Sequence, residues 1–234
     1  ERLVKKEKMT AEAKAAALGH VKTATDLNAA RGSDLLIEAA TENLDLKLKI
    51  FEQLSELAGD TTILATNTSS ISITRLAAAT KLADRVIGMH FFNPVPVMQL
   101  VELNRGLQTS EATYAAVETV TKKIGKTPVK VRNSPGFVVN RLLCPMINEA
   151  VYALAEGLAS AEEIDSAMKL GANHPMGPLA LCDLIGLDVE LAVMNVLFEG
   201  FKDPKYRPAP LLVEMVEAGY LGRKSGRGFF SYAK

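Results

Sequence analysis

Three short apolar runs, each followed directly by polar residues, constrain the fold of this 234-residue chain more than any other feature. They cover residues 34–39, 62–65 and 85–89, and each has the length of a β-strand. Between them, residues 44–57 carry apolar side chains at helical spacing, and residues 72–80 form a shorter, alanine-rich helix candidate. Alternating strands and helices predict parallel strands that are joined by crossover helices.

The pattern becomes helical further along the chain. Ser110 is a predicted N-cap for one more helix, and residues 129–131 are the last predicted strand. Ser134 and Pro135 are then predicted to begin a helix, which Pro145 should kink.

No strand pattern of similar quality follows, and apolar spacing predicts helices over residues 161–170, 188–198 and 211–218. The fold class is therefore an α/β parallel sheet followed by an all-α part. We expect the two domains to cover residues 1–133 and 134–234.

The composition argues against several classes of protein. The 27 basic and 27 acidic side chains cancel, so a nucleic-acid partner is not expected. No apolar run could span a bilayer, and the first residues lack the apolar centre of a signal peptide. Cys144 and Cys182 form no CxxC motif and are predicted to be buried, reduced thiols. We expect a cytoplasmic protein without a membrane anchor or a metal site.

Polar side chains follow all three predicted parallel strands. Glu42 follows the first strand, Asn67 and Ser69 follow the second, and His90 and Asn93 follow the third. Ligands bind beyond the carboxyl ends of the strands in open parallel sheets. These strand ends therefore predict a polar pocket at one edge of the sheet.

His90 is the strongest candidate for catalysis, because imidazole exchanges protons near neutral pH. Glu102 follows a short extended run, and a carboxylate on one imidazole nitrogen would leave the other free to act on substrate. Asn140 would face the same cleft if its helix packs across the sheet edge. Spacing alone leaves the structural alternatives open: a buried structural histidine, a surface glutamate and an exposed asparagine.

A phosphate-binding glycine motif is missing from the sequence. The basic, glycine-rich residues 222–228 match neither a Walker A motif nor GxGxxG. A dinucleotide-binding half should begin with a strand, GxGxxG and a helix. We therefore expect a strand–helix–strand unit of about 50 residues to precede Glu1.

Five motifs resemble the L-3-hydroxyacyl-CoA dehydrogenase family, with the bacterial 3-hydroxybutyryl-CoA enzymes most similar. They occur in the family's order along the whole chain: NTSSISIT from Asn67, HFFNPVPVM from His90, PGFVVNRLL from Pro135, MKLGANHPMGP from Met168 and LGRKSGRGFFSY from Leu221. HFFNP and PGFVVNR are the most specific of these. The resemblance implies an N-terminal Rossmann domain that binds NAD, with NADP not excluded, and a helical C-terminal domain that forms a homodimer.

The resemblance also implies roles for single residues. His90 would be the catalytic base and Glu102 its orienting carboxylate, while Ser69 and Asn140 would hold the oxygen and thioester of an acyl-CoA substrate. Lys6 or Lys8 would bind the CoA phosphate, although Glu7 interrupts that basic run. The implied cofactor contacts are Glu42, Lys47, Asn67, Ser69, Asn93 and Lys224.

The reaction implied by the resemblance is oxidation of (S)-3-hydroxyacyl-CoA to 3-oxoacyl-CoA, in fatty-acid or butanoate metabolism. Without the glycine motif, we expect residues 1–234 alone to be inactive. Two alternatives remain open from the sequence: a related hydroxyacid dehydrogenase, and a non-catalytic dimeric scaffold on the same fold.

Overall fold

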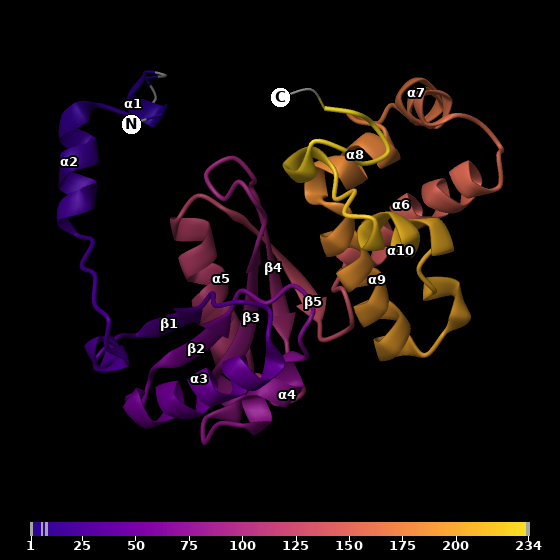
Figure 1. Cartoon of the computed structure of the whole chain (residues 1–234). Coiled ribbons are helices and arrows are strands. Elements are labelled where there is room, and N and C mark those ends of the chain that lie inside the picture. The colour runs from indigo at the N-terminus through magenta and orange to yellow at the C-terminus, as the bar shows by residue number, and fades with distance from the viewer. Residues whose placement is uncertain (1, 6, 8, 233–234) are drawn as a thin grey trace.

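The computed structural model of the chain describes residues 2–5, 7 and 9–232. Figure 1 shows a sheet with covering helices beside a bundle of helices, and residues 133–138 connect the two parts. Within the described residues, no helix is long and apolar enough to cross a membrane.

Five strands form one sheet in the order β1-β2-β3-β4-β5. Strands β1 to β3 are parallel, β4 is antiparallel to β3, and β5 is parallel to β4. The bounds of β1 to β5 are Leu35–Glu38, Ile63–Thr66, Val86–Phe91, Leu100–Arg105 and Thr127–Arg132. The prediction of three parallel strands is thus confirmed.

Strand β4 was predicted only as a short extended run, and its direction was not foreseen. The segment between β3 and β4 covers residues 92–99 and contains no helix. A parallel connection needs a crossover of a dozen or more residues, whereas a shorter loop can only reverse the chain. Residues paired across β3 and β4 consequently include His90 and Glu102.

Helices cover both faces of the sheet. Helices α3 (Leu44–Leu57) and α4 (Ile73–Ala78) pack on one face, and α5 (Glu111–Lys123) packs on the other. The predicted Ser110 cap is confirmed, because its hydroxyl accepts a hydrogen bond from the Thr113 amide. Two separate cores result, one built around Phe51, Leu64, Ile73 and Leu76 and the other around Ile87, Met89, Leu103 and Val117.

The N-terminal helices stand apart from the sheet. Helices α1 (Arg2–Lys5) and α2 (Ala11–Gly19) lie away from it, and an extended segment leads from α2 through the short turn η1 (Leu27–Ala30) to β1 (Figure 1). No residue of α2 is buried. Lys6 and Lys8, the predicted CoA contacts, lie outside the described residues.

The described residues of the second part form five helices, which confirms the predicted all-α character. The bounds of α6 to α10 are Val139–Ala155, Ala161–Gly171, Pro178–Ile185, Leu187–Phe201 and Pro210–Glu217. The short turn η2 (Ala83–Arg85) precedes β3 in the sheet part, whereas η3 (Pro204–Tyr206) and η4 (Arg223–Ser225) belong to the helical part. Helix α8 was not predicted, although Pro178 at its first position is a typical helix start.

The predicted start of α6 at Ser134 and Pro135 is wrong, because the helix begins at Val139. Gly136 and Phe137 both have positive φ, at 71° and 51°. A right-handed helix cannot pass through left-handed residues, so residues 135–138 form a turn instead.

Candidate active site

The register of β3 and β4 brings His90 and Glu102 together. The two residues are direct cross-strand partners. His90 Nδ1 lies 2.8 Å from Glu102 Oε2, and both side chains are buried. In this arrangement the carboxylate fixes the imidazole orientation and leaves Nε2 as the nitrogen that can exchange a proton.

The second oxygen of Glu102 is held by the beginning of α6. The backbone N–H groups of Val138 and Val139 each donate to Oε1 at 3.0 Å. These hydrogen bonds anchor the Glu102 carboxylate to the start of α6. Glu102 is only 1% exposed, so its charge is stabilised by these groups rather than by water.

Aromatic rings enclose His90. The Phe92 ring centroid lies 4.5 Å from that of the imidazole, and the Phe137 centroid lies 5.7 Å away. Within the described residues, His90 Nε2 makes no hydrogen bond. The imidazole ring is therefore fixed by the hydrogen bond at Nδ1 and by aromatic packing. Nε2 remains without a partner among the described residues.

Glu42 organises the loop after β2. Its Oε1 accepts hydrogen bonds from the Ser69 and Ser70 backbone N–H groups, both at 3.0 Å, and from the Ser70 hydroxyl at 2.8 Å. The Thr68 hydroxyl donates to the same oxygen. Burial acts to raise the pKa of Glu42, but these hydrogen bonds and the Lys47 charge outweigh it and lower the pKa.

Lys47 is buried and forms ion pairs with Glu38 and Glu42. It is 1% exposed, and its Nζ lies 2.7 Å from Glu38 Oε1 and 3.6 Å from Glu42 Oε2. Glu38 also accepts a hydrogen bond from the Thr66 hydroxyl. This network connects the ends of β1 and β2 to α3. Lys47 is linked to the predicted pocket by its ion pair with Glu42.

The structure gathers most of the other predicted residues at the carboxyl ends of β1 to β3. Asn67 Oδ1 accepts the Phe91 N–H at 2.9 Å, so this side chain connects the ends of β2 and β3. Asn93 follows β3 in an exposed loop, and Asn140 follows Val139 in the first turn of α6.

Lys224 is placed elsewhere. It lies in η4 of the helical part, where it forms an ion pair with Asp188 at the start of α9. The structure does not group it with the strand-end residues.

The sequence did not reveal the backbone donors to Glu102. These N–H groups lie at the end of the turn 135–138, in which Gly136 adopts a left-handed conformation, so a glycine before the helix is the sequence feature that could have indicated them. The role of Thr68 and Ser70 as donors to Glu42 was missed as well, because a polar loop by its sequence does not show which carboxylate it surrounds.

Comparison with known proteins agrees with this geometry. Residues 1–134 match the family described as 3-hydroxyacyl-CoA dehydrogenase, NAD binding domain, and residues 136–232 match its C-terminal domain. A 3-hydroxybutyryl-CoA dehydrogenase of Clostridioides difficile is 57% identical over 233 residues, which are 100% of this chain and 83% of that protein. The human mitochondrial hydroxyacyl-coenzyme A dehydrogenase is 43% identical over 92% of this chain and 69% of its own length.

Solved structures show the same likeness. The crystal structure of the (S)-3-hydroxybutyryl-CoA dehydrogenase from Ralstonia eutropha has a TM-score of 0.97 and 65% identity, over 100% of this chain and 82% of that one. With both family domains matched in order and the His90–Glu102 pair in place, this chain belongs to the 3-hydroxyacyl-CoA dehydrogenase family, whose members are NAD-dependent oxidoreductases.

Proposed function

We propose that the protein oxidises (S)-3-hydroxyacyl-CoA, with 3-hydroxybutyryl-CoA as the preferred substrate, to 3-oxoacyl-CoA and catalyses the reverse reaction. The observation that carries this proposal is the buried His90–Glu102 pair, with Glu102 anchored to the start of α6. The names of the Clostridioides and Ralstonia relatives support the choice of the short acyl chain.

The protein's own residues provide the proton transfer. His90 Nε2 takes the proton of the substrate's 3-hydroxyl, and Glu102 stabilises the imidazolium that forms. Bound NAD supplies the hydride acceptor for carbon 3. In the reverse direction, His90 returns the proton to the ketone oxygen.

We assign substrate positioning to residues from both parts of the chain. Ser69 follows β2 and Asn140 lies on α6, and we assign them the substrate oxygen and the thioester carbonyl. Lys6 or Lys8 would bind the CoA phosphate.

The residues at the strand ends fit the nicotinamide end of NAD. The Asn67 amide group keeps its N–H donors free of other described residues while its oxygen is fixed by Phe91, and Asn93 lies exposed in the next loop. Glu42 holds the Ser69 loop at this edge, and Lys47 acts through Glu42. Lys224 remains a proposed contact from the helical part.

The proposal includes an organisation for the chain. Residues 1–133 form the cofactor domain, and residues 134–234 form the substrate and dimerisation domain. We assign the enzyme to the cytoplasm and to fatty-acid or butanoate metabolism. A related hydroxyacid dehydrogenase is the alternative within enzymes, and a thioester assay separates the two.

The test is NADH oxidation with acetoacetyl-CoA. We expect turnover in a chain that also carries the family's glycine-motif segment, and little or none with residues 1–234 alone, because the pyrophosphate normally rests on the N-terminus of that segment's helix. Turnover with a free 3-oxo acid but not with the thioester would contradict the proposal. Tight NADH binding to residues 1–234 in a calorimetric titration would refute only the expected inactivity of these residues and would leave the proposed reaction unaffected.

A further inference from the structure

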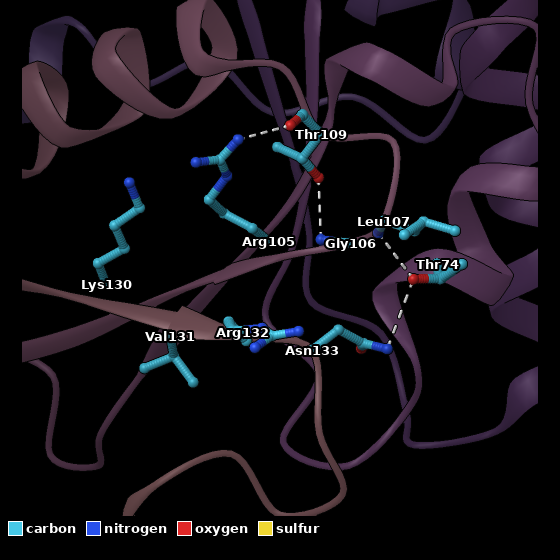
Figure 2. A pocket seen from close by; sticks show the side chains of 9 residues that line it. All are labelled: Thr74, Arg105, Gly106, Leu107, Thr109, Lys130, Val131, Arg132 and Asn133. Atoms are coloured by element: carbon cyan, nitrogen blue, oxygen red, sulfur yellow. Dashed lines mark hydrogen bonds between the residues drawn. The ribbon is translucent and has the colours of Figure 1, made fainter.

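A second pocket lies at the carboxyl ends of β4 and β5. It has a volume of about 610 Å³, within the usual range of small-molecule sites. Figure 2 shows its lining, and we name it the Arg105–Arg132 pocket. The residues that line it are Thr74, Arg105, Gly106, Leu107, Thr109, Lys130, Val131, Arg132 and Asn133.

Like charges occupy paired positions on the two strands of this pocket. Arg105 and Arg132 are direct partners in the parallel register of β4 and β5, so their side chains leave the same face of the sheet. Lys130 is two residues before Arg132 and shares that face. Equal charges at paired positions of neighbouring strands repel each other, so a bound anion would relieve this repulsion.

The protein supplies only part of that compensation. Glu111 forms ion pairs with Arg105 and with Lys130, and its side chain is 72% exposed. Within the described residues, no other carboxylate forms an ion pair with any of these three cations, and Arg132 has no side-chain partner. Glu118 also attracts Lys130 but is itself paired with Lys122, so the group carries two more positive charges than carboxylates.

Two of the three cations, Arg105 and Lys130, are held in place before any ligand arrives. Arg105 Nη2 donates to the Thr109 carbonyl oxygen at 2.9 Å, and its guanidinium lies 5.7 Å from the Tyr114 ring centroid. Lys130 Nζ lies 4.7 Å from the same centroid. Figure 2 shows the two cationic side chains on the same side of the strands, with Val131 on the other. Preorganised cations lose less entropy when they bind an anion.

This pocket is separate from the active site. Arg105 is three residues beyond Glu102 on β4, which at about 3.3 Å per residue places its backbone roughly 10 Å further along the strand. An odd spacing also puts the two side chains on opposite faces. The faces differ in their helices too, because Leu103 packs with Tyr114 of α5.

We propose that the Arg105–Arg132 pocket binds the phosphoryl group of a small molecule. A phosphoryl group carries up to two negative charges, which match the unbalanced charge, and its oxygens accept the paired N–H donors of a guanidinium. Arg132 is the principal ligand, and Arg105 and Lys130 contribute the surrounding positive potential.

Calorimetric titration of the full chain with inorganic pyrophosphate, at constant ionic strength, tests the site. The variants are Arg132→Ala and, as a matched control, Lys49→Ala, which removes one exposed positive charge from α3. The proposed CoA-phosphate lysines, Lys6 and Lys8, are common to all three chains and should contribute equally to each. Against that background, we expect pyrophosphate binding at the Arg105–Arg132 pocket to be about tenfold weaker in Arg132→Ala and unchanged in Lys49→Ala. Equal thermal unfolding curves verify that both variants fold.

Three results would overturn the proposal. They are the absence of pyrophosphate binding at millimolar concentrations, equal affinity in the wild-type chain and Arg132→Ala, and equal weakening by both variants. The last result would show a general attraction between charges rather than a site. Turnover in Arg132→Ala should stay near the wild-type value, because this residue lies outside the catalytic pair.

Discussion

His90 gains its role from the residues that surround it. Glu102 fixes Nδ1, the rings of Phe92 and Phe137 limit the motion of the imidazole, and α6 holds Glu102 in turn. His90 could be predicted as a candidate base with Glu102 as its partner, but spacing alone left a surface glutamate as the alternative for Glu102. The antiparallel register of β3 and β4 decides the question by placing Glu102 opposite it.

Loss of the base should therefore be costly. In a chain that carries the glycine motif, we expect His90→Ala to lower kcat by roughly 10² to 10⁴, the usual contribution of a positioned general base. Glu102→Gln should lower it less, because the amide keeps a hydrogen bond to the ring but loses the charge. Acetoacetyl-CoA reduction, followed by NADH absorbance, measures both. His20→Ala is the control, since His20 is exposed beyond α2, and near-normal turnover in His90→Ala would remove the base assignment.

Glu190 is a second residue whose environment is unusual. It is fully buried in the first turn of α9, and neither of its oxygens has a hydrogen-bond partner of normal geometry among the described residues. The thiols of Cys144 on α6 and Cys182 on α8 are the titratable groups beside it, and burial raises the pKa of both. Burial raises the pKa of Glu190 to about 8. The Cys144 thiol lowers the same pKa, but by less than burial raises it.

This shift predicts a pH-dependent stability. The folded protein keeps the Glu190 proton up to a pH of about 8, whereas the unfolded chain releases it near its ordinary value of 4.5. The contribution of Glu190 to the unfolding free energy should therefore be highest below pH 4.5 and fall as the pH rises to about 8. Glu190→Gln removes this dependence and should stabilise the protein at pH 8 by on the order of a few kcal/mol.

Urea denaturation at pH 5 and pH 8.5 measures the effect of Glu190→Gln. Glu214→Gln, an exposed glutamate on α10, is the matched control and should leave the pH dependence unchanged. An equal difference between the two pH values in the wild-type chain and Glu190→Gln would show that Glu190 does not titrate as described.

At the scale of elements, the turn between β5 and α6 links the two parts to the active site. Residues 135–138 direct the chain so that Val138 and Val139 point their N–H groups at Glu102. A Cβ atom on Gly136 would lie 2.6 Å from the Leu197 side chain and 3.2 Å from the Arg141 nitrogen. The turn therefore has little freedom to shift without moving α6.

Gly136→Ala should consequently affect both stability and catalysis. Its positive φ alone costs about 1–2 kcal/mol for a residue with a Cβ atom. The contact with Leu197 and the α6 backbone should add to this cost and loosen the hold on Glu102, lowering kcat about tenfold or more.

Gly125→Ala is a matched control for Gly136→Ala, because Gly125 has φ of 75° and open space around its Cα. It should lose a similar stability from the backbone conformation and keep its turnover. Equal turnover in both variants, measured with acetoacetyl-CoA, would show that the turn does not position Glu102.

The elements themselves were largely predictable, because apolar spacing and caps are local signals. The three parallel strands, α3 and the Ser110 cap follow from residues close together in the sequence. The errors arose where tertiary geometry decides: the direction of β4 depends on a short loop, and the start of α6 depends on two left-handed residues. Phe137 in particular gives no local sign of a positive φ.

At the scale of the whole molecule, the candidate site could be predicted only as a set of strand ends. That rule brought Glu42, Asn67, Ser69 and His90 to one edge, where the structure places them. It could not show that Lys47 is buried beneath this edge, because burial of a lysine depends on carboxylates from other elements. It also gave no sign that Lys224 pairs with Asp188 in the helical part.

The helical part leaves several large apolar side chains exposed. Leu142 is 69% exposed and Leu170 is 87% exposed. Leu142 also lines a cavity of about 650 Å³, bounded by the start of α6, the loop at His174 and α8, in which apolar side chains predominate. Contiguous apolar surface of this kind is typical of an interface between subunits.

We therefore expect the full chain to sediment as a homodimer at micromolar concentration. Leu142→Glu places a charge on the α6 surface and should shift the equilibrium toward monomer, because a desolvated, unpaired charge in an interface costs several kcal/mol. Leu107→Glu is the matched control: Leu107 is 86% exposed but belongs to the sheet part, so its variant should remain dimeric. A wild-type monomer in sedimentation velocity would contradict dimerisation altogether. A dimer that Leu142→Glu leaves intact would place the interface on another surface of the chain.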